Sequence, residues 1–324
     1  MKSPLLSLPG AVPAEGVDEA VAAHYGDLFR EQRALAGGTG FVDLSHRGVV
    51  TVTGEDRLSW LHLLLTQHVT DLPAGRATEA LILSAHGHIE HALYLVDDGE
   101  TVWMHAEPGT QEALIAYLES MKFFYRVEVA DRTADFAVVH LPAGSITEVP
   151  QGVVVRETPY GRDLFLPRAD LESYAADTEK HGPAAGLLAY EALRVENHQP
   201  RLGFETDHRT IPHELGWIGS AVHLQKGCYR GQETVARVQN LGKPPRRLVF
   251  LHLDGSEVHL PPHGTELHLA ADGPDGRTIG FITTSVRHHE LGPIALALVK
   301  RNVPVDAPLV ADTTAAAQEV VVEP

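Results

Sequence analysis

The spacing of apolar residues changes in kind near Arg247, and this change constrains the fold more than any other feature of the chain. Before it, strand-like spacing alternates with the spacing of one helix face. After it, the chain has only short β-rich runs between turns rich in Gly, Pro and Asp, at residues 248–253, 266–269, 278–285 and 294–299. Such runs are typical of a small antiparallel barrel or sandwich. The sequence therefore predicts an α+β body followed by an antiparallel β-barrel.

The α+β body shows the element order of a ferredoxin-like unit. A strand at residues 49–52 precedes a helix, strands at 80–84, 89–96 and 101–105, a helix at 110–121 and strand segments at 127–129 and 136–141. Strand, helix, strands, helix, strand is the order that defines this unit. We expect it to span about residues 47–140.

The chain divides into three expected parts. Residues 1–20, rich in Pro, Ala and Gly, are expected to form a loose arm; residues 21–243 form the body, and residues 244–324 form the barrel with a loose tail. Apolar residues at helical spacing predict a helix over residues 17–36. The basic stretch Lys243–Arg247 is expected to be a connector whose charges are solvated.

Composition limits the partners. The chain carries 26 Lys and Arg against 43 Asp and Glu, a formal net charge of −17, and such a chain repels nucleic-acid phosphates. Its apolar runs are shorter than a membrane span, and its N-terminus does not resemble a signal peptide. One cysteine excludes an intrachain disulfide and fits a reducing compartment. We therefore expect a cytoplasmic protein that binds neither nucleic acid nor membranes directly.

Histidine is abundant, with 20 residues, and His86, His88 and His91 lie close together in the sequence. This spacing can place metal ligands on a strand or turn, but no Cys or Asp completes a recognised zinc motif. The commoner interpretation is a set of polar surface residues. We expect no metal site here and assign this cluster no role.

The segment from Lys226 to Glu233, KGCYRGQE, contains the only cysteine, Cys228. Two basic side chains flank it, and a predicted helix begins just after it, at Gln232. Positive potential at a helix start and nearby cations favour the thiolate, which is the reactive form. On chemistry alone, a small buried core residue is the commoner interpretation of a free cysteine.

The same eight residues resemble the KGCYxGQE signature of YgfZ-type folate-binding proteins, relatives of the glycine-cleavage T-protein (aminomethyltransferase). Further similarities follow in the order of that superfamily, over about residues 22–303. They lie at Phe41–His46 (FVDLSH), Val52–Leu61 (VTGEDRLSWL), Leu193–Glu196 (LRVE), Pro212–Trp217 (PHELGW), Thr278–Gly280 (TIG) and Ile294–Val299. Each motif is short, but their order is specific.

The resemblance implies the three-part T-protein fold and a tetrahydrofolate cofactor, or a one-carbon derivative of it. It also implies work on the assembly or repair of iron–sulfur client proteins, with Cys228 as the reacting thiol and Lys226 beside it. Folate and the local turn would be held by Glu196, Tyr229, Arg230, Gly231 and Gln232. Client identity, the chemistry at Cys228 and the oligomeric state stay open, as does whether folate is substrate or effector.

Glu196 also stands out by its position. It is expected at the end of a helix, partly inward, where the helix dipole disfavours a carboxylate, so it needs a partner. The two N–H groups of a pterin edge would suit it. Arg194 or another structural arginine would suit it equally, and the residues alone leave both possibilities open. The resemblance favours the pterin.

One departure from the T-protein pattern bears on activity. T-proteins carry an Asp-Asp pair after a Gly-Gly turn, and His91 and Ala92 stand in that register here. Glu90 is adjacent, but strand alternation aims it at the opposite face from His91. We therefore expect a folate pocket without glycine-cleavage transfer. The alternative is a folate-dependent aminomethyltransferase or another one-carbon transferase, and whether the chain is an enzyme stays open.

Overall fold

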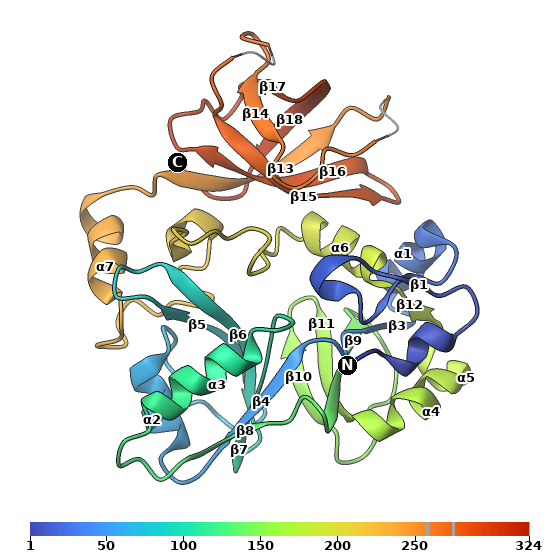
Figure 1. Ribbon diagram of the computed structural model, residues 1–324, viewed down its shortest axis with the longest axis vertical. Coiled ribbons are helices and arrows are strands. Elements are labelled where there is room, and N and C mark those ends of the chain that lie inside the picture. The colour runs from blue at the N-terminus through green and yellow to red at the C-terminus, as the bar shows by residue number, and fades with distance from the viewer. Residues whose placement is uncertain (257–258, 274–275, 324) are drawn as a thin grey trace. The chain divides into compact units, whose positions relative to one another are not determined.

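The computed structural model describes residues 1–256, 259–273 and 276–323 (Figure 1). The chain forms two compact units. Unit 1 consists of Met1–Leu81 and His91–Tyr190, and unit 2 consists of Ile82–Glu90 and all residues from Glu191 onward. The short segment Ile82–Glu90 thus leaves the first unit and contributes to the second.

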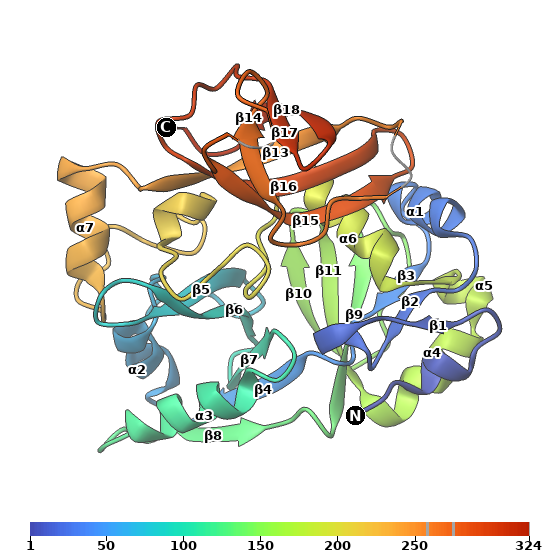
Figure 2. The same ribbon diagram turned by 45° about the horizontal axis from the view of Figure 1, so that its top comes forward.

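Unit 1 contains the expected ferredoxin-like arrangement, except that the strand predicted at residues 136–141 belongs to the second sheet and the motif closes with the strand at 128–131. Its first sheet has the strand order β5 (Ala77–Leu83), β6 (Ile89–Asp97), β7 (Thr101–Ala106), β4 (Gly48–Thr53) and β8 (Glu128–Asp131), with helices α2 (Arg57–Leu64) and α3 (Gln111–Ser120). The order β6-β7-β4-β8 is that of the ferredoxin-like motif, and β5 extends it at one edge. Helix α3 runs beside β8 and β4 (Figure 2). Strand β4 lies between β7 and β8, and its valines are fully buried.

A second five-stranded sheet completes unit 1. Its order is β10 (Val154–Thr158), β11 (Gly161–Pro167), β9 (Phe136–Pro142), β3 (Phe41–Asp43) and β12 (Ala184–Ala185). Helices α1 (Leu28–Ala36), α4 (Leu171–Ala176) and α5 (Thr178–His181) and the 3-10 turn η3 (Arg168–Asp170) accompany it. Alternate residues of β9 and β11, such as Val139 and Leu164, point into one apolar core with Phe41 and Tyr174.

The N-terminal segment differs from expectation, because it is packed and not loose. It forms η1 (Pro4–Ser7), β1 (Val12–Pro13), η2 (Gly16–Asp18) and β2 (Ala22–His24). Leu5 is fully buried in the core of the second sheet, and Asp18 pairs with buried His46 at 2.9 Å. The helix expected over residues 17–36 is confirmed only as α1, since β2 and the turn at Gly26 precede it.

Unit 2 contains the predicted C-terminal barrel. Six strands close in the order β13 (Arg246–Leu253), β16 (Gly292–Lys300), β15 (Gly280–His288), β14 (Glu266–Leu269), β17 (Leu309–Ala311) and β18 (Thr314–Val320). Alternating residues such as Val249, Leu251, Ala295 and Ala297 fill its interior. Closure leaves no unpaired sheet edge, which is how small β domains avoid self-association.

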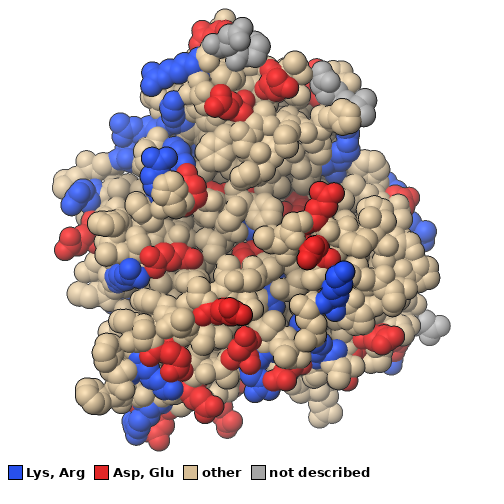
Figure 3. Space-filling model, viewed as in Figure 1, with Lys and Arg blue, Asp and Glu red and all other residues tan. Residues whose placement is uncertain are grey.

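The basic stretch before the barrel is not a solvated connector. Arg247 is fully buried, and Arg246 donates to Glu214 at 2.8 Å and to Asp207 at 2.6 Å. Burial alone would lower the pKa of Arg246, but these carboxylates outweigh it and raise the pKa above its ordinary value. On the face shown in Figure 3, acidic and basic side chains are interspersed. Every described helix is too short or too polar to cross a membrane.

Candidate functional site

Residues 226–231, here called the cysteine loop, lie in unit 2 between η4 (Pro212–Leu215) and α7 (Gln232–Leu241). Cys228 is exposed, so it is not a core residue. Helix α7 begins at Gln232, directly after Gly231 at φ 82°. The side-chain oxygen of Gln232 accepts a hydrogen bond from the backbone N–H of Tyr229 at 3.2 Å. The loop is thereby tied to the first turn of the helix that follows it.

The cysteine loop packs on the turn between β5 and β6. A Cβ atom on Gly231 would lie 2.5 Å from the carbonyl oxygen of Ser84, and one on Gly87 would lie 2.7 Å from the Cβ of Thr234. Only glycine allows this approach at these left-handed positions. Arg230 adds an ion pair with Glu90 at 2.9 Å. The loop therefore packs in a defined position against a turn that is distant in the sequence.

Lys226 and Tyr229 form the buried side of the loop. The Nζ atom of Lys226 lies 5.1 Å from the centroid of the Tyr229 ring, a cation–π distance. Burial lowers the pKa of Lys226 to about 8, and nearby Cys228 opposes this shift. Burial also raises the pKa of Tyr229 to about 12. Near neutral pH, Lys226 can therefore hold a proton or release it beside the exposed thiol.

Glu196 ends helix α6 (Leu187–Glu196), and its side chain is 40% exposed. Its Oε2 lies 3.3 Å from Nε2 of His288. Arg194, the expected alternative partner, instead pairs with Glu191 at 2.8 Å and Glu205 at 3.0 Å, so that assignment is wrong. The carboxylate of Glu196 thus lies beside the His288 ring, interacts with His198, whose pKa is lowered by burial, and keeps accepting capacity for a ligand.

The register of the T-protein Asp-Asp pair holds no free acid. His91 and Ala92 are buried, whereas Glu90 is exposed and pairs with Arg230. The exposure of Glu90 beside buried His91 agrees with the expectation that they lie on opposite faces of β6. The carboxylate closest in sequence to this register is already occupied by a guanidinium.

Comparison with known proteins agrees with this architecture. Residues 19–146 match the family model of the GCVT N-terminal domain. An aminomethyltransferase of Herpetosiphon aurantiacus is 28% identical over 308 residues, which cover 85% of this chain and 82% of the relative. One of Rubrobacter xylanophilus is 28% identical over 331 residues, covering 92% and 87%. The crystal structure of the glycine cleavage system aminomethyltransferase T of Bartonella henselae superposes with a TM-score of 0.81 at 19% identity, over 98% of this chain and 94% of that one.

This chain has the aminomethyltransferase fold.

Within the aminomethyltransferase fold, unit 1 holds a second polar cluster that sequence reasoning missed. This cluster, here called the closed network, consists of Arg47, His105, His140, Arg156 and Asp163, all of them buried, and its two arginines also pair with Glu107 and Glu79 at 3.4 Å. Asp163 accepts hydrogen bonds from Arg156 at 2.7 Å, His140 at 2.8 Å and His105 at 3.1 Å. Nδ1 of His105 faces Arg47 at 3.4 Å and must accept, because a guanidinium only donates. Its five members come from distant segments, so the sequence carries no local signal for it.

Burial and hydrogen bonding shift the pKa values of two members of the network, His105 and Asp163. Burial lowers the pKa of His105 to about 4, so its ring is neutral at neutral pH. Burial alone would raise the pKa of Asp163, but hydrogen bonds from His105 and His140 hold it well below its ordinary range. Every oxygen of this carboxylate is used within the network, which makes it a structural element of unit 1.

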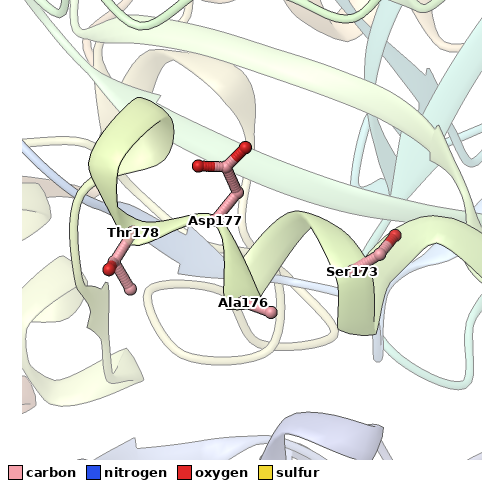
Figure 4. Close-up of a pocket in the computed structure, with 4 residues that line it drawn as sticks. All are labelled: Ser173, Ala176, Asp177 and Thr178. Atoms are coloured by element: carbon pink, nitrogen blue, oxygen red, sulfur yellow. The ribbon is translucent and has the colours of Figure 1, made fainter.

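Other polar features carry less chemistry. His86 is exposed while His91 is buried, and the described part of the chain has no group of three or more His, Cys, Asp and Glu side chains placed to hold a metal ion. Figure 4 shows a hollow along α4 and α5 lined by Ser173, Ala176, Asp177 and Thr178. Asp177 there caps α5 and pairs with Lys180 at 2.8 Å. These groups stabilise the helix and form no reactive set.

Proposed function

We propose that this protein binds tetrahydrofolate and uses the thiol of Cys228 in the assembly or repair of iron–sulfur client proteins. The observation that carries the proposal is the environment of the only cysteine. Cys228 is exposed in a loop fixed by Gln232 and Gly231, next to a buried lysine whose pKa lies near 8. A structural cysteine needs none of these features, whereas a reacting thiol needs access and a nearby cation.

The state of Glu196 supports folate as the ligand. Its carboxylate is part-exposed at the end of a helix and is paired with a neutral imidazole rather than an arginine. An anion in that position is short of donors. The amino group and ring N–H of a pterin offer two donors side by side, which a carboxylate accepts in bidentate fashion. Relatives named aminomethyltransferase and the matching GCVT domain agree with a folate ligand.

The remaining residues of the cysteine loop take supporting roles. Lys226 places a cation near the thiol of Cys228, and the Tyr229 ring lies 5.1 Å from its Nζ atom. Gln232 and Gly231 set the loop conformation, and Arg230 ties it to Glu90. The resemblance of KGCYRGQE to the YgfZ signature supports iron–sulfur proteins as the clients of this thiol.

Aminomethyl transfer to folate is the alternative function. The names of the relatives favour it. Two observations oppose it: His91 and Ala92 are buried in the register of the acidic pair, and adjacent Glu90 is engaged by Arg230. Production of methylenetetrahydrofolate and ammonia from an aminomethylated carrier protein would establish this alternative.

The first experiment compares iron–sulfur enzyme activities in a deletion strain that expresses the parent protein, Cys228→Ala or the control Ser220→Ala. The parent and the control should restore activity, and Cys228→Ala should not, at equal protein levels. Alkylation of the native parent should modify Cys228 without unfolding. Full complementation by Cys228→Ala would exclude a reacting thiol.

The second experiment measures tetrahydrofolate binding by calorimetry. Glu196→Gln keeps the shape but replaces one acceptor with a donor, and it should cost about 1.5–3 kcal/mol of binding free energy. Glu319→Gln, a matched change at an exposed barrel residue, should bind as the parent does. Equal affinity of Glu196→Gln and the parent would reject the pterin assignment.

A further inference from the structure

We infer that His288 is a positioning residue that orients the carboxylate of Glu196 for the pterin edge. This inference rests on the proposed folate function and names a residue that the sequence motifs do not include. His288 ends β15 of the barrel, and Glu196 ends α6, so the chain folds to bring together two positions 92 residues apart (288 − 196).

The ring of His288 is fixed in one tautomer. Its side chain is 1% exposed, and its Nδ1 lies 3.2 Å from the backbone N–H of Glu290 and 3.1 Å from that of Leu291. Both backbone groups can only donate, so Nδ1 accepts. The proton of the neutral ring therefore lies on Nε2, the atom that faces Glu196.

The Nε2–H group lacks a well-aligned acceptor in this state. It lies 3.3 Å from Oε2 of Glu196, an ion-pair distance, without hydrogen-bond alignment. A buried N–H without an aligned acceptor is costly, and a small rotation of the Glu196 carboxylate supplies one. Contacts of this kind are often loose without ligand and tighten when it binds. His288 thus favours one orientation of a carboxylate that is otherwise free to rotate.

A neutral donor suits this task better than a cation. The charged and titratable groups around His288 are Glu196, His289 and Glu290, and burial is the main cause that lowers its pKa. Once aligned, a neutral imidazole supplies one proton to one lone pair of Oε2, so Oε1 stays available for a ligand. A guanidinium, such as that of Arg194, would take both oxygens in a fork. Pairing with His288 therefore orients Glu196 and leaves its negative charge for the pterin.

Two substitutions distinguish the roles of the two ring nitrogens of His288. In His288→Asn, the amide oxygen takes the place of Nδ1 and keeps the turn at Glu290 and Leu291, because Asn caps such turns well. The donor to Glu196 is lost. In His288→Gln, the longer amide reaches the place of Nε2 and can restore that donor. The pair distinguishes a role in the turn from a role toward Glu196.

Calorimetry with tetrahydrofolate should show affinity lower by about threefold to tenfold in His288→Asn, the size of one modest hydrogen bond. His288→Gln should recover most of it, and thermal unfolding of His288→Asn should match the parent. In Glu196→Gln, adding His288→Asn should cause little further loss, because His288 acts through Glu196.

Each contrary result has its own meaning. Parent-like affinity in His288→Asn, or losses that add independently of Glu196→Gln, would overturn the positioning role and leave the folate function standing. Parent-like affinity in Glu196→Gln would overturn the pterin assignment and the role of His288 with it. Failure of His288→Gln to recover affinity, with both variants equally destabilised, would make His288 a structural residue of the turn.

Discussion

The closed network of unit 1 and the cysteine loop with Glu196 in unit 2 are both rich in charge, but they use it differently. In the closed network, Asp163 receives three donors and all five side chains are buried. In unit 2, Glu196 is part-exposed beside the His288 ring, and Cys228 is exposed. The contrast teaches that saturated polar groups stabilise a fold, whereas groups with spare bonding capacity are available for ligands.

The largest test of this contrast removes the centre of the closed network. Asp163→Ala leaves Arg156 without its buried partner and should lower the free energy of unfolding by about 3–5 kcal/mol. Cys228→Ser, the comparison change at the exposed thiol of unit 2, should alter the free energy of unfolding by less than about 0.5 kcal/mol. Urea unfolding of both variants measures the difference. Equal stability of the two variants would contradict the contrast.

Lowering the pH should destabilise the folded chain through the same network. The pKa of His105 is about 4 in the folded chain, against an ordinary value of 6.5. Between pH 4 and 6.5, His105 binds a proton in the unfolded chain but not in the folded one. Its contribution to the free energy of unfolding is therefore complete above about pH 6.5 and is lost as the pH falls toward about 4.

Urea unfolding at intervals from pH 7 to pH 4 measures this loss, and His105→Asn should show a flatter profile because it lacks the titrating ring. The imidazole signals of His105 in NMR should stay neutral until about pH 4. A midpoint near 6.5 for this residue would mean that the network is open to water.

A smaller and more local effect is expected at two glycines of the cysteine loop. Gly227 and Gly231 both have positive φ, at 97° and 82°, so alanine strains the backbone at either position. Only Gly231 also meets the turn at Ser84 and Gly87. Gly231→Ala should therefore cost about 1–3 kcal/mol more than Gly227→Ala.

The two glycine variants should also differ in alkylation. Gly231→Ala should displace the loop from the β5–β6 turn, so it should change the alkylation rate of Cys228 more than Gly227→Ala does. Identical stabilities and rates would show that the loop is not seated on the β5–β6 turn.

Local patterns in the sequence were sufficient for much of the fold. Short β-rich runs such as residues 248–253, set between turns, predicted the barrel, and the order of elements around β4 predicted the ferredoxin-like unit, because both depend on neighbours in the chain. The helix start at Gln232 was predicted for the same reason. Which residues act in function remains a prediction from motifs, including the roles of Cys228 and Glu196.

Contacts between distant segments could not be predicted. Nothing near Leu5 signals that it is buried in the second sheet, so the N-terminal segment was expected to be loose. The sequence also could not show that Arg194 is taken by Glu191 and Glu205, or that His288 faces Glu196. Such partners depend on the packing of whole elements, and spacing along the chain contains no record of it.

The passage of Ile82–Glu90 into unit 2 has a consequence for synthesis on the ribosome. Gly87 packs against Gly231 and Thr234, which are translated more than 140 residues later (231 − 87 = 144). At about 5–20 residues per second, the partners of this turn are translated roughly seven to thirty seconds after it. During that interval unit 1 can fold while the turn is still without its partners. Slow translation of the segment between Gly87 and Gly231 would prolong the time in which a chaperone, or another nascent chain, can bind the β5–β6 turn before its partners are made.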